Sequence, residues 1–279
     1  MKRRALLRAG AGLLGALAFS LAAQAAALKI GVTPGPLADS VHVAAQEASQ
    51  QGLEVEVVEF SDWTAPNLAL ASKDLDANYF QHQAFLDNAV RESGYPLRAV
   101  GIGILSNVGL YSTRIKSFAE LKEGARVAVA NDPVNQGRGL QLLEKAGLIR
   151  LREGVGPRAR LSDIVDNPQH LKLVEIDGPQ LVRAIDDVDL AQGYPGHFAA
   201  AGTLDPGSAL LFSGVDDLYY AIRFVARTDN ADDPRLQRFI RLYQQSPAVR
   251  EQIRTSNANN ERLYSLPWLH NGAETAQPK

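Results

Sequence analysis

Cysteine is absent from the 279 residues, and this absence excludes several classes of protein. Without a thiol the chain has no disulfide framework, no cysteine-ligated zinc, no iron–sulfur cluster and no cysteine nucleophile. An excess of positive charge is also missing, because 29 Lys and Arg stand against 31 Asp and Glu. A mildly acidic chain lacks the basic surface that nucleic-acid binding requires. We therefore expect no nucleic-acid partner.

Acidic residues are missing from the first 25 residues, which resemble an export signal. A basic start (MKRRALLR) precedes the uncharged segment Ala9–Leu21, which is short for a stable membrane span. Ala23-Gln24-Ala25 places small residues where a signal peptidase needs them. The pair Arg3-Arg4 fits a twin-arginine signal, and an ordinary secretory signal fits nearly as well. We expect a periplasmic protein that is soluble after cleavage near Ala25/Ala26.

The remaining sequence alternates between strand and helix patterns. Residues 28–32 and 53–60 have the composition of strands, and the helical segment 38–49 between them predicts a parallel, right-handed βαβ unit. The alternation restarts at Ser117, with a strand at 126–130 and a helix at 135–145. Two α/β units without a long linker predict two lobes with a ligand cleft between them.

Two sequence strings carry a family resemblance, Asp76–His82 (DANYFQH) and Asn131–Arg138 (NDPVNQGR). Shorter matches follow in the same order along the chain, at 29–32, 35–36, 166–168, 171–175, 179–181 and 186–187. Together these segments resemble the methionine-binding lipoproteins of bacterial ABC importers, the MetQ/NlpA type, over residues 28–255.

The resemblance implies a fold and an activity. The fold is an α/β, type II-like, two-lobed periplasmic binding protein whose chain crosses between the lobes twice, near Ser112-Thr113 and Asp217–Tyr219. Lobe one is then 28–112 plus 218–279, and lobe two is 113–217. The implied function is that of a monomeric, non-enzymatic solute-binding protein that serves an ABC permease and its ATPase, with no cofactor. The alternative is an exported enzyme, or a sensor component that never transports, on the same scaffold.

Arg138 is the strongest candidate for ligand binding, with Asn135 beside it at the start of a predicted helix. Helix-start amides and a guanidinium are both positive, and the guanidinium can bind both oxygens of a carboxylate. The alternative is a surface arginine paired with a nearby acid. The family resemblance favours ligand binding.

Tyr79, Phe80 and His82 follow a predicted strand at 75–77, and ligands of α/β sheets lie where strands end. In the family this region builds the apolar pocket around the ligand side chain, for which aromatic rings are suited. The alternatives are a core position for Phe80 and a capping role for His82.

Metal and catalytic sites have little support. His42, His170, His197 and His270 share no short spacing, so we expect no metal site. The carboxylates of Asp186-Asp187 are adjacent in sequence and do not face each other on a helix.

The sequence departs from the family at three places. Ala25-Ala26-Ala27 stands where the family has a lipid-modified cysteine, which predicts a protein without a lipid anchor. Two family asparagines that hold the ligand's amino and carboxylate groups are also missing. Around them the chain instead offers the side chains of Tyr194, His197, Tyr220 and Arg223.

Strand alternation allows only one of Ile222 and Arg223 to face the cleft. If Arg223 faces it, the ligand is an anion such as an organosulfur sulfonate, sulfinate or carboxylate. If Ile222 faces it, the pocket is more apolar. In either case we expect L-methionine to bind weakly, because its ammonium loses its acceptors.

Overall fold

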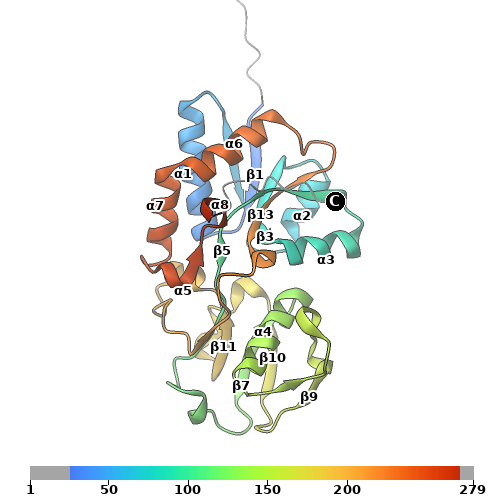
Figure 1. Cartoon of the computed structure of the whole chain (residues 1–279), viewed down its shortest axis with the longest axis vertical. Coiled ribbons are helices and arrows are strands. Elements are labelled where there is room, and N and C mark those ends of the chain that lie inside the picture. Colours follow the sequence, from blue (N-terminus) through green and yellow to red (C-terminus); the bar gives the residue numbers. More distant parts are fainter. Residues whose placement is uncertain (1–25, 271–279) are drawn as a thin grey trace, which may run out of the picture.

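The computed structural model describes residues 26–270, which form two α/β lobes arranged along the long axis of the molecule (Figure 1). The predicted signal, residues 1–25, lies outside the described residues, as does 271–279. Within the described part, no helix is both long and apolar enough to cross a membrane.

Lobe one is built on a five-stranded sheet with the order β2-β1-β3-β13-β4. Its strands are β1 (Leu28–Val32), β2 (Val55–Glu59), β3 (Ala77–His82), β4 (Leu97–Ile102) and β13 (Ile222–Arg227). β1 is parallel to β2 and β3, as the predicted βαβ unit requires, whereas β13 is antiparallel to β3 and β4. The late strand β13 therefore joins the C-terminal part of the chain to the N-terminal lobe.

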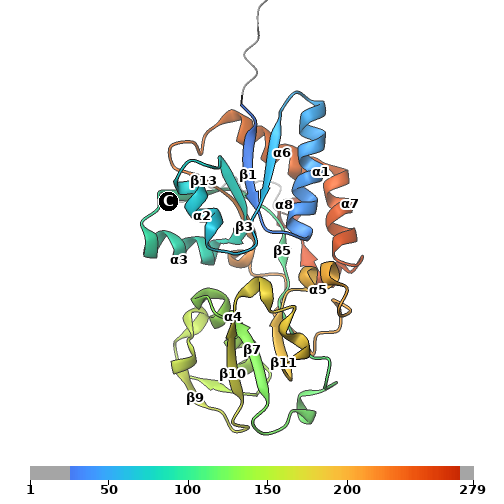
Figure 2. The ribbon, with the colours of Figure 1, turned by 180° about the vertical axis from the view of Figure 1, so that it is seen from behind.

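Helices cover both faces of this sheet, as Figures 1 and 2 show from opposite sides. One face is buried by α1 (Pro36–Gln50), α6 (Pro234–Gln245) and α7 (Pro247–Ser256), and the other by α2 (Ala65–Ala71) and α3 (Gln83–Ser93). The buried side of α1 carries Ala38, Val41, Ala44 and Ala48, at the three- and four-residue spacing of one helix face. Small side chains there let α1 pack closely on the strands.

Lobe two repeats this plan with the sheet order β10-β7-β11-β6-β12. Its strands are β6 (Gly109–Tyr111), β7 (Arg126–Ala130), β10 (Lys172–Ile176), β11 (Leu190–Gly193) and β12 (Leu211–Phe212). Helix α4 (Pro133–Lys145) packs on one face. The other face is covered by α5 (Pro195–Ala201) and the 3₁₀ turns η4 (Gly178–Gln180) and η5 (Ala184–Asp186).

Short elements complete the chain. The strands β5 (Leu105–Ser106) and β14 (Tyr264–Ser265) pair with each other, and so do β8 (Arg150–Leu151) and β9 (Ile164–Asp166). The remaining helices are η1 (Phe118–Glu120), η2 (Gly156–Arg158), η3 (Leu161–Asp163), η6 (Leu218–Tyr220), η7 (Glu261–Leu263) and α8 (Pro267–His270).

Two boundaries differ from the sequence prediction. β6 belongs to the sheet of lobe two, so the first crossover lies between β5 and β6 rather than near Ser112-Thr113. The run 97–112 showed no clear sign of this change of sheet, because only the short polar step Ser106-Asn107 separates its apolar parts there. Gly178-Pro179 and the residues that follow predict a helix to about Asp186, and the structure has the two short turns η4 and η5 there instead.

Asn107 ties the two crossover segments together. Its Oδ1 accepts hydrogen bonds from the Gly214 amide at 3.0 Å and the Ser213 hydroxyl at 2.9 Å, both on the returning segment. Its Nδ2 donates to the Arg262 carbonyl at 3.1 Å. The Asn107 amide therefore helps to anchor the connection between the lobes to lobe one, together with the pairing of β5 and β14.

Candidate functional site

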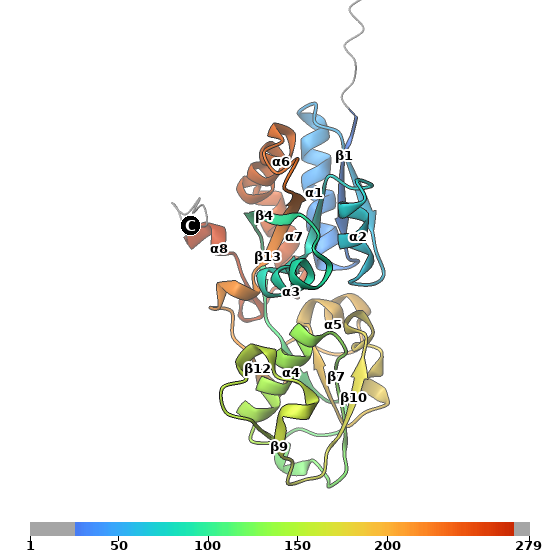
Figure 3. The same cartoon turned by 90° about the vertical axis from the view of Figure 1, so that its right-hand side faces the viewer.

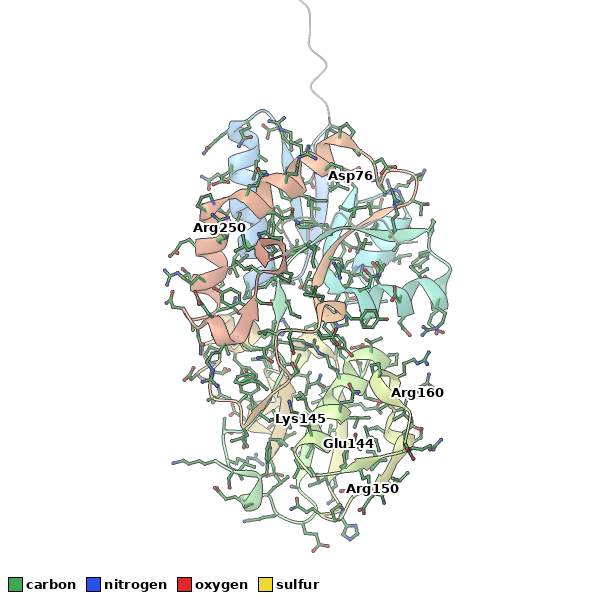
Figure 4. The ribbon with its side chains drawn as sticks, in the orientation of Figure 1. Asp76, Glu144, Lys145, Arg150, Arg160 and Arg250 are labelled. Carbon is green, nitrogen blue, oxygen red and sulfur yellow. The ribbon has the colours of Figure 1, made fainter. Side chains whose placement is uncertain are left out.

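A cavity lies between the lobes, and both lobes contribute to its lining. The cavity has a volume of about 70 Å³. Figure 4 shows side chains of the upper and lower lobes meeting in this region, and Figure 3 shows α5 and α4 at the top of lobe two, beneath lobe one. Lobe one and the returning segment contribute Thr33, Pro34, Pro36, Leu37, Trp63, Phe80, Gln81, His82, Phe85, Ser106, Tyr220, Ile222 and Asn257. Lobe two contributes Asn135, Arg138, Tyr194, Gly196 and His197.

Arg138 brings a buried positive charge to this cavity from the second turn of α4. It is 5% exposed, and burial lowers the pKa of its guanidinium. The guanidinium carbon lies 4.2 Å from the centre of the Tyr220 ring, a cation–π contact, and Nη2 donates weakly to the Ser106 carbonyl at 3.4 Å. Among the described residues, no carboxylate forms an ion pair with Arg138. A buried cation that forms no ion pair with a carboxylate of the protein is suited to receive an anion from outside the chain.

The start of α4 is fixed by Asp132. Its carboxylate caps the helix by accepting from the Val134 and Asn135 amides at 3.2 and 2.9 Å, and it also accepts from Asn135 Nδ2 at 3.0 Å. Gly137 and the following turn come close to η2, since a Cβ on Gly137 would lie 2.4 Å from the Pro157 carbonyl oxygen. Cap and glycine together set the position from which Arg138 reaches the cavity.

Asn135 connects the two lobes through a short polar network. Its Oδ1 accepts from the Tyr194 hydroxyl at 2.6 Å and lies 3.2 Å from His82 Nε2. His82 Nδ1 accepts from the Phe85 amide and caps α3, so the ring proton is on Nε2, which donates to Asn135. Burial, aided by the nearby Arg138, lowers the pKa of His82 to about 3. His82 is therefore a neutral donor that bridges the lobes at pH 7.

Aromatic rings form the apolar wall. Trp63 meets Tyr194 edge to face at 5.7 Å across the two lobes, and Phe85 packs against Phe80 and Trp63 at 5.8 and 6.5 Å. His197 lies 5.5 Å from Tyr194, and burial lowers its pKa to about 4, so its ring is uncharged at pH 7. This wall offers dry contact area to an apolar or sulfur-bearing group.

Next to this wall, the side-chain amides of Asn67, Asn78 and Gln81 form hydrogen bonds with one another. Gln81 Oε1 accepts from Asn67 Nδ2 at 2.9 Å, and Gln81 Nε2 donates to Asn67 and Asn78. Asn78 Nδ2 in turn donates to Asn67 Oδ1 at 2.9 Å. The network holds the end of β3, which carries Phe80 and His82.

The structure brings together seven of the nine predicted site residues. Arg138, Phe80, His82, Asn135, Tyr194, His197 and Tyr220 all line the cavity. His82 also has the capping role that the sequence left as its alternative.

The other two predicted residues lie elsewhere. Tyr79 is buried in lobe one, and its ring stacks on that of Phe224 with the ring centres 4.2 Å apart. Its hydroxyl shares a hydrogen bond with the hydroxyl of Tyr243. The reason is that β3 continues to His82, so Tyr79 lies within the strand and its ring packs in the core of lobe one. Arg223 is also absent from the lining, and its Nη2 donates to the Leu218 carbonyl at 2.9 Å. Ile222 takes the cavity position instead.

Several lining residues were not predicted from the sequence. Trp63 and Phe85 supply much of the aromatic wall, and Asn257 comes from the end of α7. Trp63 was detectable in principle, since it follows β2 at the strand end where ligands of α/β sheets lie. Asn257 gave no local signal, because it reaches the cavity only through the packing of α7 on α1.

The described residues contain no group of three or more His, Asp or Glu side chains that could hold a metal ion.

Curated proteins with similar sequences are binding proteins and lipoproteins by name. The chain is 42% identical over 219 residues to the "D-methionine-binding lipoprotein MetQ" of Salmonella typhimurium, covering 78% of this chain and 81% of that protein. It is 39% identical over 233 residues to "Outer membrane lipoprotein 2" of Mannheimia haemolytica, covering 83% and 84%.

Solved structures share the two-lobed fold. The "Crystal Structure of the Methionine Binding Protein, MetQ" matches with a TM-score of 0.78 at 38% identity, covering 83% of this chain and 95% of that one. A nutrient-binding protein from Burkholderia cenocepacia, bound to methionine, matches with a TM-score of 0.78 at 37% identity, covering 83% and 97%. The predicted two-lobed α/β fold is confirmed.

The prediction of a protein without a lipid anchor is wrong for this group of proteins. The curated relatives just described are lipoproteins by name, which implies a lipid anchor. The prediction rested only on the three alanines at 25–27, and the export segment before them lies outside the described residues.

The family model described as "NlpA lipoprotein" matches residues 28–263, nearly the whole of both lobes. This match and the identities of about 40% lead to one assignment. The chain belongs to the NlpA lipoprotein family.

Proposed function

We propose that this chain is the substrate-binding component of an ABC transporter, and that its cavity binds a small carboxylate of the methionine class. The relatives named for methionine binding support the ligand class, and the structure titled as an ABC transporter's periplasmic substrate-binding protein, from Coxiella burnetii, supports the transport role at 38% identity. The family consists of binding lipoproteins, which confirms the predicted non-enzymatic role and sets the enzyme alternative aside.

One observation carries the proposal, the buried Arg138 without an acidic partner in a cavity between two lobes. A ligand carboxylate placed on the guanidinium supplies the missing negative charge, and the planar fork can hold both oxygens. The aromatic wall of Trp63, Phe80 and Phe85 then receives the ligand's side chain.

The location and partners follow from the same reasoning. The export segment at 1–25 supports a domain that works in the periplasm, where it delivers its ligand to a permease and its ATPase. We expect a monomer, because a two-lobed binding protein encloses its ligand within one chain.

Arg138→Ala tests the proposal. Removing one partner of a buried charge pair costs about 2–5 kcal/mol, so affinity should fall by about 30-fold or more. Calorimetry with methionine and its organosulfur analogues measures this on protein whose bound ligand has been removed by unfolding and refolding.

The matched control is Arg150→Ala, which removes an exposed arginine of lobe two, labelled in Figure 4, away from the cavity lining. The control should bind as the unchanged protein does. Equal affinity of Arg138→Ala and the unchanged protein would refute the role of Arg138. Failure of the unchanged protein to bind any of these compounds would refute the proposed function.

A further inference from the structure

The charges around the cavity are unbalanced. Arg138 is the one lining residue that carries a charge at pH 7, since His82 and His197 are neutral and the lining contains no aspartate or glutamate. Five acids lie within three residues of a lining residue along the chain, and all of them stay outside the lining: Asp39, Asp62, Asp87, Asp132 and Asp217. The closed cavity therefore offers one positive charge and no negative charge.

A zwitterionic ligand such as methionine matches these charges poorly. Its carboxylate can pair with Arg138, but its ammonium carries three N–H donors and a charge that must also be satisfied away from water. The best-placed acceptor, Asn135 Oδ1, already receives the Tyr194 hydroxyl and faces the His82 Nε2–H. Gln81 is used within the amide network behind the wall.

The remaining oxygens and nitrogens of the lining are uncharged. The hydroxyls of Thr33, Ser106 and Tyr220, the amide of Asn257 and the imidazole of His197 can accept a hydrogen bond, but none carries negative charge to offset a buried ammonium. The residue that β13 contributes to the lining, Ile222, is apolar and offers no acceptor. A ligand with a carboxylate and a neutral 2-substituent leaves no such charge unpaired.

We propose that the cavity selects methionine-sized acids without an ammonium group, such as the 2-hydroxy and 2-oxo analogues of methionine, over methionine itself. This inference rests on the proposed function, because it assumes a carboxylate on Arg138 and a thioether side chain on the aromatic wall. It adds the chemical class of the head group. The 2-oxo acid brings only acceptors, and the 2-hydroxy acid brings one neutral donor.

The test is calorimetry on refolded, ligand-free protein with three probes: L-methionine, 2-hydroxy-4-(methylthio)butanoate and 4-methylthio-2-oxobutanoate. We expect each analogue to bind at least tenfold more tightly than L-methionine. Methionine binding that equals or exceeds that of both analogues would overturn the inference and leave the proposed function standing. Absence of binding by all three probes would instead refute the proposed function.

Two variants distinguish selection of the ligand's head group from a general loss of ligand affinity. Ile222→Asn adds an amide oxygen to the lining and should move the methionine-to-analogue affinity ratio at least tenfold toward methionine. Val165→Asn makes a similar apolar-to-amide change on the exposed strand β9 of lobe two and should leave the ratio as it is. An unchanged ratio in folded Ile222→Asn would contradict the role assigned to Ile222.

Discussion

At the scale of single residues, His82 shows how the chain uses an ionisable group as a neutral one. One ring nitrogen accepts from the Phe85 amide, and the other donates to Asn135 in the opposite lobe. A charged imidazolium could not keep the first of these hydrogen bonds, and it would face the Arg138 guanidinium. The side chain therefore links the start of α3 to α4 only while it is unprotonated.

This neutrality predicts a dependence of stability on pH. The pKa of His82 is lowered to about 3 and that of His197 to about 4, whereas in the unfolded chain both protonate near pH 6.5. Between these values the unfolded state binds protons that the folded state does not, so the free energy of unfolding falls as pH falls from about 6.5 to about 3. Each group contributes at most about 1.4 kcal/mol per pH unit.

Urea unfolding without ligand, at several pH values, measures this slope. His82→Gln should make the slope smaller because it removes one titrating group. His42→Gln makes the same substitution at a half-exposed position outside the cavity lining and is the control for the change of residue type. Equal slopes for all three proteins would show that His82 does not titrate as described.

The placement of Tyr79 shows a limit to predicting cavity-lining residues from the sequence alone. The motif DANYFQH correctly located Phe80 and His82 at the cavity, and it failed for Tyr79 because the strand was expected to end at 77. Because the strand continues to His82, Tyr79 lies within it and packs in the core of lobe one. A similar ambiguity at Ile222 and Arg223 could not be resolved from sequence, since the register of β13 against β3 shifts between Ile222 and Phe224.

At the scale of elements, α4 was the most predictable part of the site. The sequence predicted a helix at 135–145, and the structure begins it two residues earlier, at Pro133, with Asp132 as its cap. The contacts of that helix with η2 and Tyr194 were not predictable, because they join segments separated by about 20 and 60 residues in sequence. Local sequence thus determined where helix α4 forms, whereas tertiary packing determined which residues its first turns contact.

Removing the cap should therefore affect both folding and binding. Asp132→Ala loses acceptors for the Val134 and Asn135 amides, which should lower the free energy of unfolding by about 1–2 kcal/mol. It also frees Asn135 Nδ2, so ligand affinity should fall several-fold. Urea unfolding and calorimetry measure the two effects.

Asp132→Asn is the matched control, because asparagine caps helices about as well as aspartate. It should retain most of the stability and affinity that the alanine variant loses. A fully stable, fully binding Asp132→Ala protein would show that the cap does not position Arg138.

At the scale of the whole molecule, the lobes are held in contact by small residues facing large ones. A Cβ on Gly178 of lobe two would lie 2.0 Å from Trp63 Cζ3 of lobe one, and one on Gly196 would lie 2.7 Å from Pro36 Cγ. Trp63 also packs on Tyr194 and lines the cavity, so the same ring touches both the ligand space and the opposite lobe. Closure and binding are therefore coupled through Trp63.

Gly178→Ala should weaken binding by obstructing closure rather than by altering the ligand contacts. The added methyl group overlaps the six-membered ring of Trp63, and the lobes must separate slightly or the indole must move. Because the closed form then becomes a smaller fraction of the population, affinity should fall at least tenfold while each lobe stays folded. Small-angle scattering with saturating ligand should give a larger radius of gyration for Gly178→Ala than for the unchanged protein.

Combining Gly178→Ala with Trp63→Phe removes the ring atoms that the added methyl group meets, so the loss of affinity caused by Gly178→Ala should be smaller in that background. If the cost of Gly178→Ala is the same with tryptophan and with phenylalanine at 63, then contact between these two residues does not control closure.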